Sequence, residues 1–380
     1  MIWNKKILYA LATLSGTIIG VGLFSLPYIT LQVGIWVMLA YFLVLGVLVI
    51  LVHYFFGEVA LNTPDYLRLP GFAKIYLGKP GQIIAFISGI LGLIGALLAC
   101  LIVGGEFLTG LLSPIFGGSY VFYVLIYFLI GAILIYGGIK FIGRVEFWGL
   151  VLFFVVLIFI FIKGLPVFDI KSLLMIHDSG FKIQNLFLPY GAILFSLWGA
   201  ALIPEAEEML KEDKKLLKKI IPISILIPIF VYLFFIFLIL GLTGFQTTPS
   251  ALTGLKNVLG DGIVGLGLFF GVITTFTSFI ALGLTLKKIF NYDLKIAHPF
   301  SWFIACFIPL ILFVLGFQNF IQVISFVGGV MLGVDGILIV LMYHKLKIKD
   351  QKSKIKMLTV FPLILVLLAG IFYEIFFLIK

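Results

Sequence analysis

Two segments of the chain combine helix-breaking residues with polar side chains inside long apolar stretches. Glycine and proline weaken a helix, and in a bilayer a broken helix is tolerated only where it is buried in protein or lines a cavity. Amides freed at such a break suit a carboxylate, and freed carbonyls suit a cation. Close packing against another helix is the alternative use of such glycines. The first segment, residues 16–28, contains Gly16, Gly20, Gly22, Pro27, Thr17 and Ser25.

The second interrupted segment is residues 185–205. It has Gly191 and Ser196 in its interior and Pro189 and Pro204 near its ends. Two spans interrupted at corresponding places in two halves of a chain are the sequence pattern of a transporter binding site near the bilayer midplane. The two segments therefore predict a site between them.

Three hydroxyl side chains share one face of a later apolar segment, because Thr274, Thr277 and Ser278 follow the helical i, i+3 and i+4 spacing. Hydroxyl oxygens that converge with backbone carbonyls are hard ligands for a cation. Hydrogen bonding of each hydroxyl to its own helix is the alternative. This face is therefore a candidate ion-coupling site.

Asp335 lies within an apolar segment, and an acid at membrane depth is a functional hypothesis by default. It could carry a proton, line the transport path or accept a hydrogen bond from a hydroxyl on a neighbouring helix. Glu58, Glu106 and Glu205 lie near the ends of apolar segments, where we expect gate or loop contacts. His53 lies deeper, and we expect it to be packed and neutral.

The elements that carry these residues are transmembrane helices. Of the 380 residues, 63% are hydrophobic and 11% are charged, against about 25% charged in soluble proteins. Because about 20 apolar residues cross a bilayer, the pattern predicts an all-α polytopic membrane protein with eleven spans. Their predicted limits are 7–28, 33–56, 82–112, 119–139, 144–165, 185–204, 219–242, 262–289, 297–315, 318–343 and 357–378.

The basic residues set the predicted orientation. With the N-terminus in the cytoplasm, inner segments hold 21 of the 26 Lys and Arg residues. The odd number of spans then places the C-terminus outside the plasma (inner) membrane. The net charge of +10 does not indicate nucleic-acid binding, because the basic residues are spread over short loops.

Residues 16–28, GTIIGVGLFSLPY, resemble the first-span motif of the amino acid/auxin permeases and of the hydroxy and aromatic amino acid permeases. Residues 195–199, FSLWG, followed by IPEAEE at 203–208, are similar to the sixth span of the wider amino acid–polyamine–organocation superfamily. The resemblance extends to about residue 345. It implies the leucine-transporter-like fold, with residues 1–165 and 185–343 as inverted repeats and residues 357–378 as an extra helix.

The resemblance also implies roles for individual residues. Thr17 and the backbone around Gly20, Val21 and Gly22 would hold the substrate, with its carboxylate on the backbone. The amino group and side chain would meet four residues of the sixth span: Phe195, Ser196, Trp198 and Gly199. In sodium-coupled members, hydroxyls of span eight meet carbonyls of span one, which here would come from Gly16 and Ile19. Packing against lipid or protein is the alternative for the two aromatic residues.

These features predict a single-domain secondary transporter of neutral amino acids, aromatic or branched, that works by alternating access. Sodium or protons would drive it, and the absence of a lysine in residues 145–162 favours sodium over the proton-coupled relatives that carry one. We expect no enzyme activity, no cofactor beyond sodium and no ATP-binding motif.

The alternatives are transport of another small solute on the same fold, a membrane-embedded enzyme and a channel. An enzyme would need a cluster of acids or histidines at one membrane face, and the four histidines are scattered.

Overall fold

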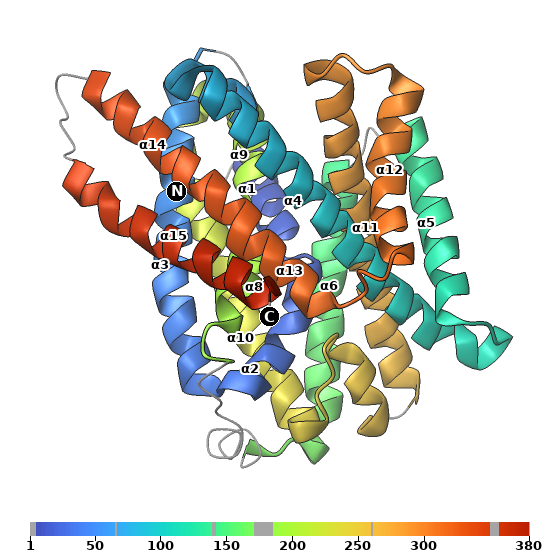
Figure 1. Ribbon diagram of the computed structural model, residues 1–380. Coiled ribbons are helices and arrows are strands. Elements are labelled where there is room, and N and C mark those ends of the chain that lie inside the picture. Colours follow the sequence, from blue (N-terminus) through green and yellow to red (C-terminus); the bar gives the residue numbers. More distant parts are fainter. Residues whose placement is uncertain are drawn as a thin grey trace.

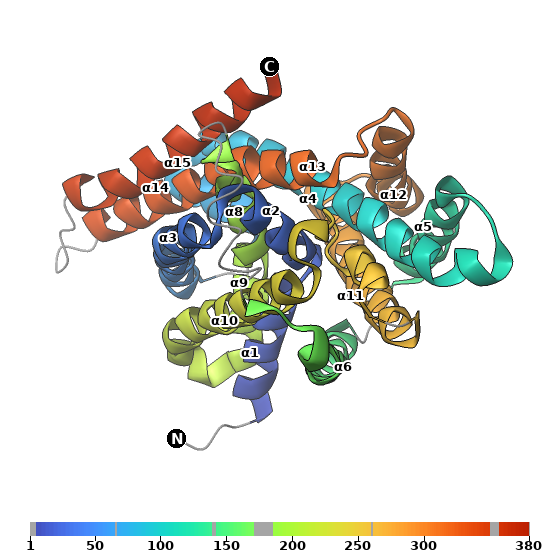
Figure 2. The ribbon, with the colours of Figure 1, turned by 90° about the horizontal axis from the view of Figure 1, so that it is seen from below.

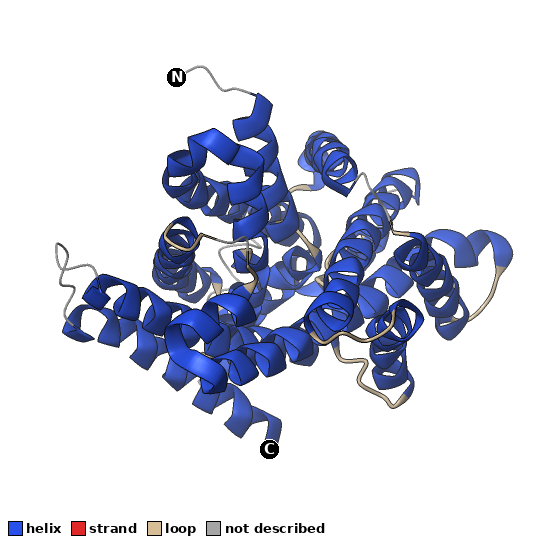
Figure 3. Ribbon diagram, turned by 90° about the horizontal axis from the view of Figure 1, so that it is seen from above, coloured by secondary structure: helices blue, strands red, loops and turns tan. Residues whose placement is uncertain are grey.

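The structure is a computed structural model that describes residues 5–64, 67–138, 142–170, 185–259, 261–349 and 357–379. Within these residues every regular element is a helix (Figure 3). The main helices are α1 (Lys5–Ile18), α2 (Leu26–Val33), α3 (Ile35–Leu61), α4 (Leu69–Phe116), α5 (Tyr120–Gly137), α6 (Ile142–Gly164), α8 (Leu188–Leu197), α9 (Ile203–Leu210), α10 (Leu217–Thr243), α11 (Asp261–Lys288), α12 (His298–Val314), α13 (Phe320–Phe326), α14 (Gly333–Lys349) and α15 (Met357–Ile379).

Short 3₁₀ and π helices join or extend these elements. The 3₁₀ helices are η1 (Val21–Ser25), η2 (Leu165–Val167), η4 (Ala200–Leu202), η5 (Lys211–Leu216), η6 (Gly244–Gln246) and η7 (Leu252–Asn257), and the π helices are η8 (Ile289–Asp293) and η9 (Val327–Leu332).

The helices account for the eleven predicted spans. Among the described residues, seven helices are long and apolar enough to cross a membrane, and α1 with η1–α2 forms an eighth span bent by 41°. Three shorter apolar helices cover the fifth, ninth and eleventh predicted spans: Val151–Val167, His298–Val314 and Val360–Phe376.

The first and sixth spans are each broken in the middle, as predicted. Pro27, Pro189 and Pro204 lie in the first turns of α2, α8 and α9. Proline is tolerated there because the first amides of a helix have no intrahelical partner. These prolines therefore start half-helices instead of kinking continuous ones.

The broken spans lie inside the bundle. Figure 2 shows α2, α8 and α9 in the middle, with α3 and α10 on one side and α4 and α11 on the other. The helix α15 lies along α14 at the edge of the bundle (Figure 1). The unwound parts of both broken spans are thus surrounded by protein, as their exposed backbone groups require.

One span differs from the sequence expectation, and another is preceded by a short helix. The backbone of α4 is non-helical at Gly78, where φ is 77°, so its first turns from Leu69 form a short helix before the third span, which begins close to the predicted residue 82. The tenth contains the π helix η9, where the sequence predicted a continuous span. Single π turns within longer helices are frequent at functional sites.

Candidate functional site

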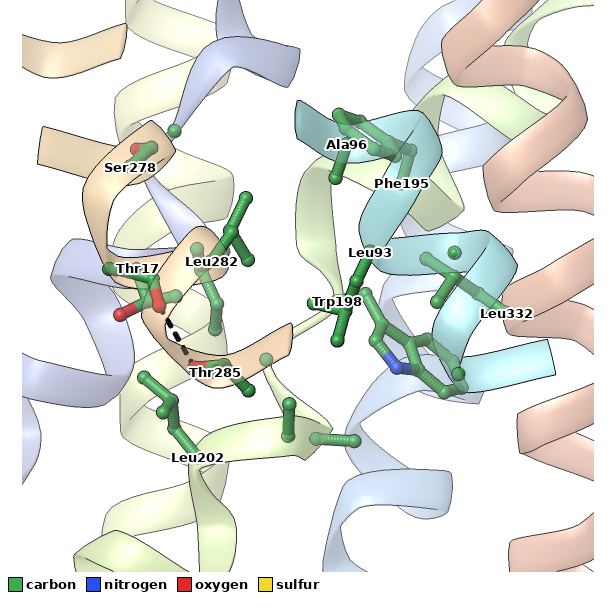
Figure 4. A pocket seen from close by; sticks show the side chains of 18 of the residues that line it. Thr17, Leu93, Ala96, Phe195, Trp198, Leu202, Ser278, Leu282, Thr285 and Leu332 are labelled. Carbon is green, nitrogen blue, oxygen red and sulfur yellow. Dashed lines mark hydrogen bonds between the residues drawn. The ribbon is translucent and has the colours of Figure 1, made fainter. Parts of the chain in front are cut away.

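One cavity of about 210 Å³ lies at the two breaks, between α4, α11 and the half-helices (Figure 4). The structure brings to its wall all fourteen residues that the sequence singled out for substrate or ion binding. These are Gly16, Thr17, Ile19, Gly20, Val21, Gly22, Phe195, Ser196, Trp198, Gly199, Thr274, Thr277, Ser278 and Asp335.

The break in the first span frees two backbone carbonyls. In an α-helix each N–H donates to the carbonyl four residues back. Here Gly20 N–H donates to Ile18 O at 2.8 Å, and Leu23 N–H donates to Gly20 O at 3.3 Å. The carbonyls of Gly16 and Ile19 therefore lose their usual donors at the C-terminal end of α1, which carries partial negative charge.

The same break frees two backbone amides. Within the described residues, the N–H groups of Val21 and Gly22 donate to no backbone or side-chain acceptor. They stand at the start of η1 and α2, where the aligned peptide dipoles carry partial positive charge. This end of the half-helix can therefore receive an anionic group such as a carboxylate.

The break in the sixth span is held by a side chain from another helix. Gly199 follows the end of α8, and its N–H donates to His53 Nε2 at 2.9 Å. His53 Nδ1 lies 2.9 Å from Val49 O on its own helix, α3. Because Nε2 accepts a hydrogen bond, Nδ1 carries the proton and the ring is neutral. The expectation of a packed, neutral histidine is confirmed, and its bond to the broken helix is an addition to it.

The two breaks also contact each other through glycines. A Cβ on Gly22 would lie 2.9 Å from Ser196 Cα, and a Cβ on Gly199 would lie 2.8 Å from Ile18 Cγ1. Both distances are shorter than real side chains allow. These two glycines are therefore required for the close approach of the first and sixth spans.

Tyr232, on α10, joins the ends of both broken helices. Its fully buried hydroxyl donates to Ile18 O at the end of α1 and to Ser196 O near the end of α8, the latter at 2.8 Å. One hydroxyl proton is shared by two carbonyls. Sequence reasoning missed this residue because nothing near Tyr232 in the chain marks it.

The cavity has one hydroxyl-bearing wall and one apolar wall (Figure 4). The hydroxyls of Thr17, Ser278 and Thr285 lie on the α1 and α11 side. Opposite them lie side chains of α4, the sixth-span break and η9: Leu93, Ala96, Phe195, Trp198 and Leu332. The apolar wall can accommodate a hydrophobic side chain.

The hydroxyls on the α1 and α11 side differ in their hydrogen bonds. Thr277 Oγ1 donates to Thr274 O at 3.0 Å, and Thr17 Oγ1 donates to Thr13 O at 2.9 Å. The bond of Thr277 is the bond within one helix that the sequence left open as the alternative for the α11 hydroxyls. Ser278 Oγ faces the first break, where a Cβ on Gly20 would lie 3.5 Å from it.

Asp335 lies on the opposite side of the cavity and is 5% exposed. It accepts a hydrogen bond from the Ser88 hydroxyl of α4. This is the hydroxyl of a neighbouring helix that the sequence left open as a partner. The acid thus ties α14 to α4 while it faces the cavity.

Comparison with protein families identifies the chain. Its sequence matches the profile of the tryptophan/tyrosine permease family over residues 3–377. The chain belongs to this family. The resemblance noted in the sequence is thereby confirmed, and the permease is a multi-pass secondary amino acid transporter and not an enzyme. A comparison with curated protein sequences gives no match.

Solved structures with a similar fold are transporters. MhsT in complex with L-phenylalanine is 16% identical, with a TM-score of 0.73 over 97% of the permease and 98% of MhsT. The nucleobase-cation-symport-1 family transporter Mhp1, closed with bromovinylhydantoin bound, is 12% identical, with a TM-score of 0.65 over 97% and 90% of the two chains. Inward-facing Mhp1 is also 12% identical, with a TM-score of 0.65 over 87% and 75%. The leucine-transporter-like fold of the permease is confirmed.

The two ends of the cavity differ in the permease. At one end its lining reaches Arg68, which forms an ion pair of 2.7 Å with Glu205 of α9. At the other end three aromatic rings pack beside the first break, where Phe24 lies edge-on against Phe107 at 4.9 Å and Phe235 at 6.1 Å. Phe24 is fully buried, so protein covers the first break at this end.

Of the other two acids near helix ends, Glu106 contacts a loop as expected, whereas Glu58 contacts two helices. Glu58 pairs with Lys218 and, at 3.0 Å, with Lys347, and it thereby joins α3 to α10 and α14. Glu106 accepts a hydrogen bond of 2.7 Å from Ser250. Both acids therefore join separate elements of the bundle.

Replacing His53 with alanine is expected to weaken substrate binding about tenfold and to cost about 1–3 kcal/mol of stability, because Gly199 N–H would be buried without an acceptor. His53→Gln retains a side-chain acceptor, so we expect it to lose less substrate affinity and less stability than His53→Ala. Substrate titration and thermal unfolding of the purified variants measure both effects. Equal losses in the two variants would contradict the role of His53 as an acceptor.

Proposed function

We propose that the permease carries an aromatic amino acid, with the substrate carboxylate on the free amides of Val21 and Gly22. These two unpartnered amides at the start of a half-helix are the observation that carries the proposal. The family's name and the phenylalanine complex of MhsT support an aromatic substrate.

The remaining groups of the substrate match the rest of the cavity. The C-terminal end of α8 carries partial negative charge, which suits the ammonium group. Ser196 and Gly199 border that end, and Phe195 and Trp198 offer rings for the aromatic side chain. Paired aromatic rings contribute about 0.5–1.5 kcal/mol beyond the area they bury, which favours aromatic over branched substrates.

Sodium is the coupling ion that we propose, bound between the first break and α11. The carbonyls of Gly16 and Ile19 lack helical donors, and Ser278 Oγ lies beside the same break, on the same side of the cavity. Thr274 and Thr277 lie on the same wall and add hydroxyl oxygens once Thr277 turns from its helix. A proton on Asp335 is the second candidate, because this acid is buried and faces the cavity.

Alternating access would use the two ends of the cavity. The Arg68–Glu205 ion pair would close the inner end, and the rings around Phe24 would close the outer end. The predicted orientation in the plasma membrane has the N-terminus in the cytoplasm and the C-terminus outside. In this orientation, uptake would run from the outer end of the cavity to the inner end.

Thermal stability of the purified permease against the twenty amino acids, with and without sodium, tests substrate and ion together. A ligand present at a hundredfold excess over its Kd adds about 2.7 kcal/mol to folding stability. We expect stabilisation by tryptophan, tyrosine or phenylalanine, and more of it with sodium.

Ser278→Ala should remove the sodium effect, with Thr285→Ala as the matched hydroxyl control on α11. Stabilisation by aliphatic amino acids alone would contradict the aromatic proposal, and an undiminished sodium effect in Ser278→Ala would contradict the ion site.

A further inference from the structure

The eleventh span carries a buried acid that the transport site does not use. Glu374, near the end of α15, is 3% exposed. Its side chain packs between Gly191 of α8 and Gly329 of η9. The helix that lies at the edge of the bundle therefore places a carboxyl group against the outer half of the broken sixth span.

The fit around this carboxyl group leaves no room for another ligand. A Cβ on Gly191 would lie 2.6 Å from Glu374 Oε1, and a Cβ on Gly329 would overlap Glu374 Cγ. None of these three residues lines the cavity at the two breaks, or a second cavity lined by Tyr28, Tyr120 and Leu188. A metal ion or an organic solute does not fit, whereas a proton needs no space.

The polar surroundings of Glu374 do not match an ionised carboxylate. Within the described residues, the nearby Ser325 Oγ is buried without a hydrogen-bond partner, Glu374 forms no ion pair, and the backbone of Gly191 is the one group that favours the ionised form of Glu374. The titratable groups that face it are the phenols of Tyr41 on α3, Tyr190 on α8 and Tyr373 on α15. A carboxylate buried without an ion pair is costly, so the packed arrangement favours the protonated acid.

We propose that Glu374 is a proton-binding site that is filled when the permease closes on its outer side. In the predicted orientation α8 begins at the outer end of its span, and the break that follows Leu197 would act as its hinge. When α8 moves away from η9, water reaches the carboxyl group, which releases its proton to the outside. When α8 returns, the carboxylate takes a proton from external water before it is buried. The proposal rests on alternating access, and it holds whichever ion drives transport.

Linkage gives this proposal a measurable consequence. If closure of the outer side raises the affinity of Glu374 for a proton, then proton binding to Glu374 must favour closure by the same factor. For one linked proton the equilibrium between the open and closed outer side changes by up to about tenfold per pH unit. Acidic external pH therefore favours the outer-closed state, with or without substrate.

A labelling experiment measures outer opening without any substrate, so its result does not depend on the proposed amino acid. Leu188, at the start of α8, lines the outer cavity with Tyr28 and Tyr120. In a background with Cys100→Ala and Cys306→Ala, Leu188→Cys reports opening through its reaction with a membrane-impermeant methanethiosulfonate. Ser119→Cys, exposed in the loop before α5, corrects for the intrinsic pH dependence of thiol reactivity.

We expect the ratio of Leu188→Cys to Ser119→Cys labelling rates to fall about tenfold or more between about pH 8 and pH 5. Glu374→Gln mimics the protonated acid and should give a low ratio at every pH, whereas Glu374→Asp and Asp335→Asn should keep the pH dependence. An undiminished dependence in Glu374→Gln would overturn the proposal. A pH-independent ratio in the chain with native Glu374 would overturn it as well, whether or not the variants fold.

Discussion

Replacing Gly22 with alanine is expected to abolish transport while the helices remain folded in the membrane. The added Cβ would lie 2.9 Å from Ser196 Cα and 3.0 Å from Phe195 Cδ1. The first of these neighbours is backbone, which cannot yield without moving α8. The substitution therefore separates the two breaks and displaces the amides that we propose for the carboxylate. Uptake by proteoliposomes and substrate binding to the purified variant measure the loss.

The matched control for this substitution is Gly265→Ala. Gly265 lies within α11, and a Cβ there would meet no atom within 4 Å. Alanine also favours a helix over glycine by about 1 kcal/mol, so this variant should transport normally with unchanged or higher stability. Transport by Gly22→Ala at the level of Gly265→Ala would show that the close approach at Gly22 is not needed for function.

The main features of the fold could be predicted because they depend on local sequence. Long apolar runs define the spans, and the glycines and prolines of residues 16–28 and 185–205 define the breaks. The spacing of Thr274, Thr277 and Ser278 places them on one face of one helix, and this face lines the cavity. Each of these inferences uses residues that are close together in the chain, where helical geometry fixes which side chains share a face.

Contacts between distant spans could not be predicted in this way. His53 and Gly199 are 146 residues apart, and Ser88 and Asp335 are 247 residues apart. A single buried histidine or serine in an apolar run has the same local pattern whether it contacts a break or only packs. The π helix η9 was missed for a similar reason, because residues 327–332 form it against Gly191 and Glu374, which lie on other helices.

Tyr232 is the residue outside the predicted set for which we expect the largest effect. In Tyr232→Phe the carbonyl of Ser196 would lose the donor it has in this structure, and Ile18 O would keep only Gly20 N–H. A buried polar group left without a partner costs about 1–3 kcal/mol. Because these two carbonyls belong to the two halves of the site, the cost falls on the arrangement that binds substrate.

We therefore expect Tyr232→Phe to lower transport about fivefold to 150-fold, the factor that corresponds to 1–3 kcal/mol in the barrier or in binding. Tyr127→Phe is the matched control, because Tyr127 is 1% exposed and its hydroxyl has no hydrogen-bond partner among the described residues. Both variants keep the buried ring, so a difference between them isolates the shared hydrogen bond. Equal transport by the two variants would mean that the first and sixth spans hold their positions through glycine packing alone, and the hydroxyl of Tyr232 would then only satisfy two buried carbonyls.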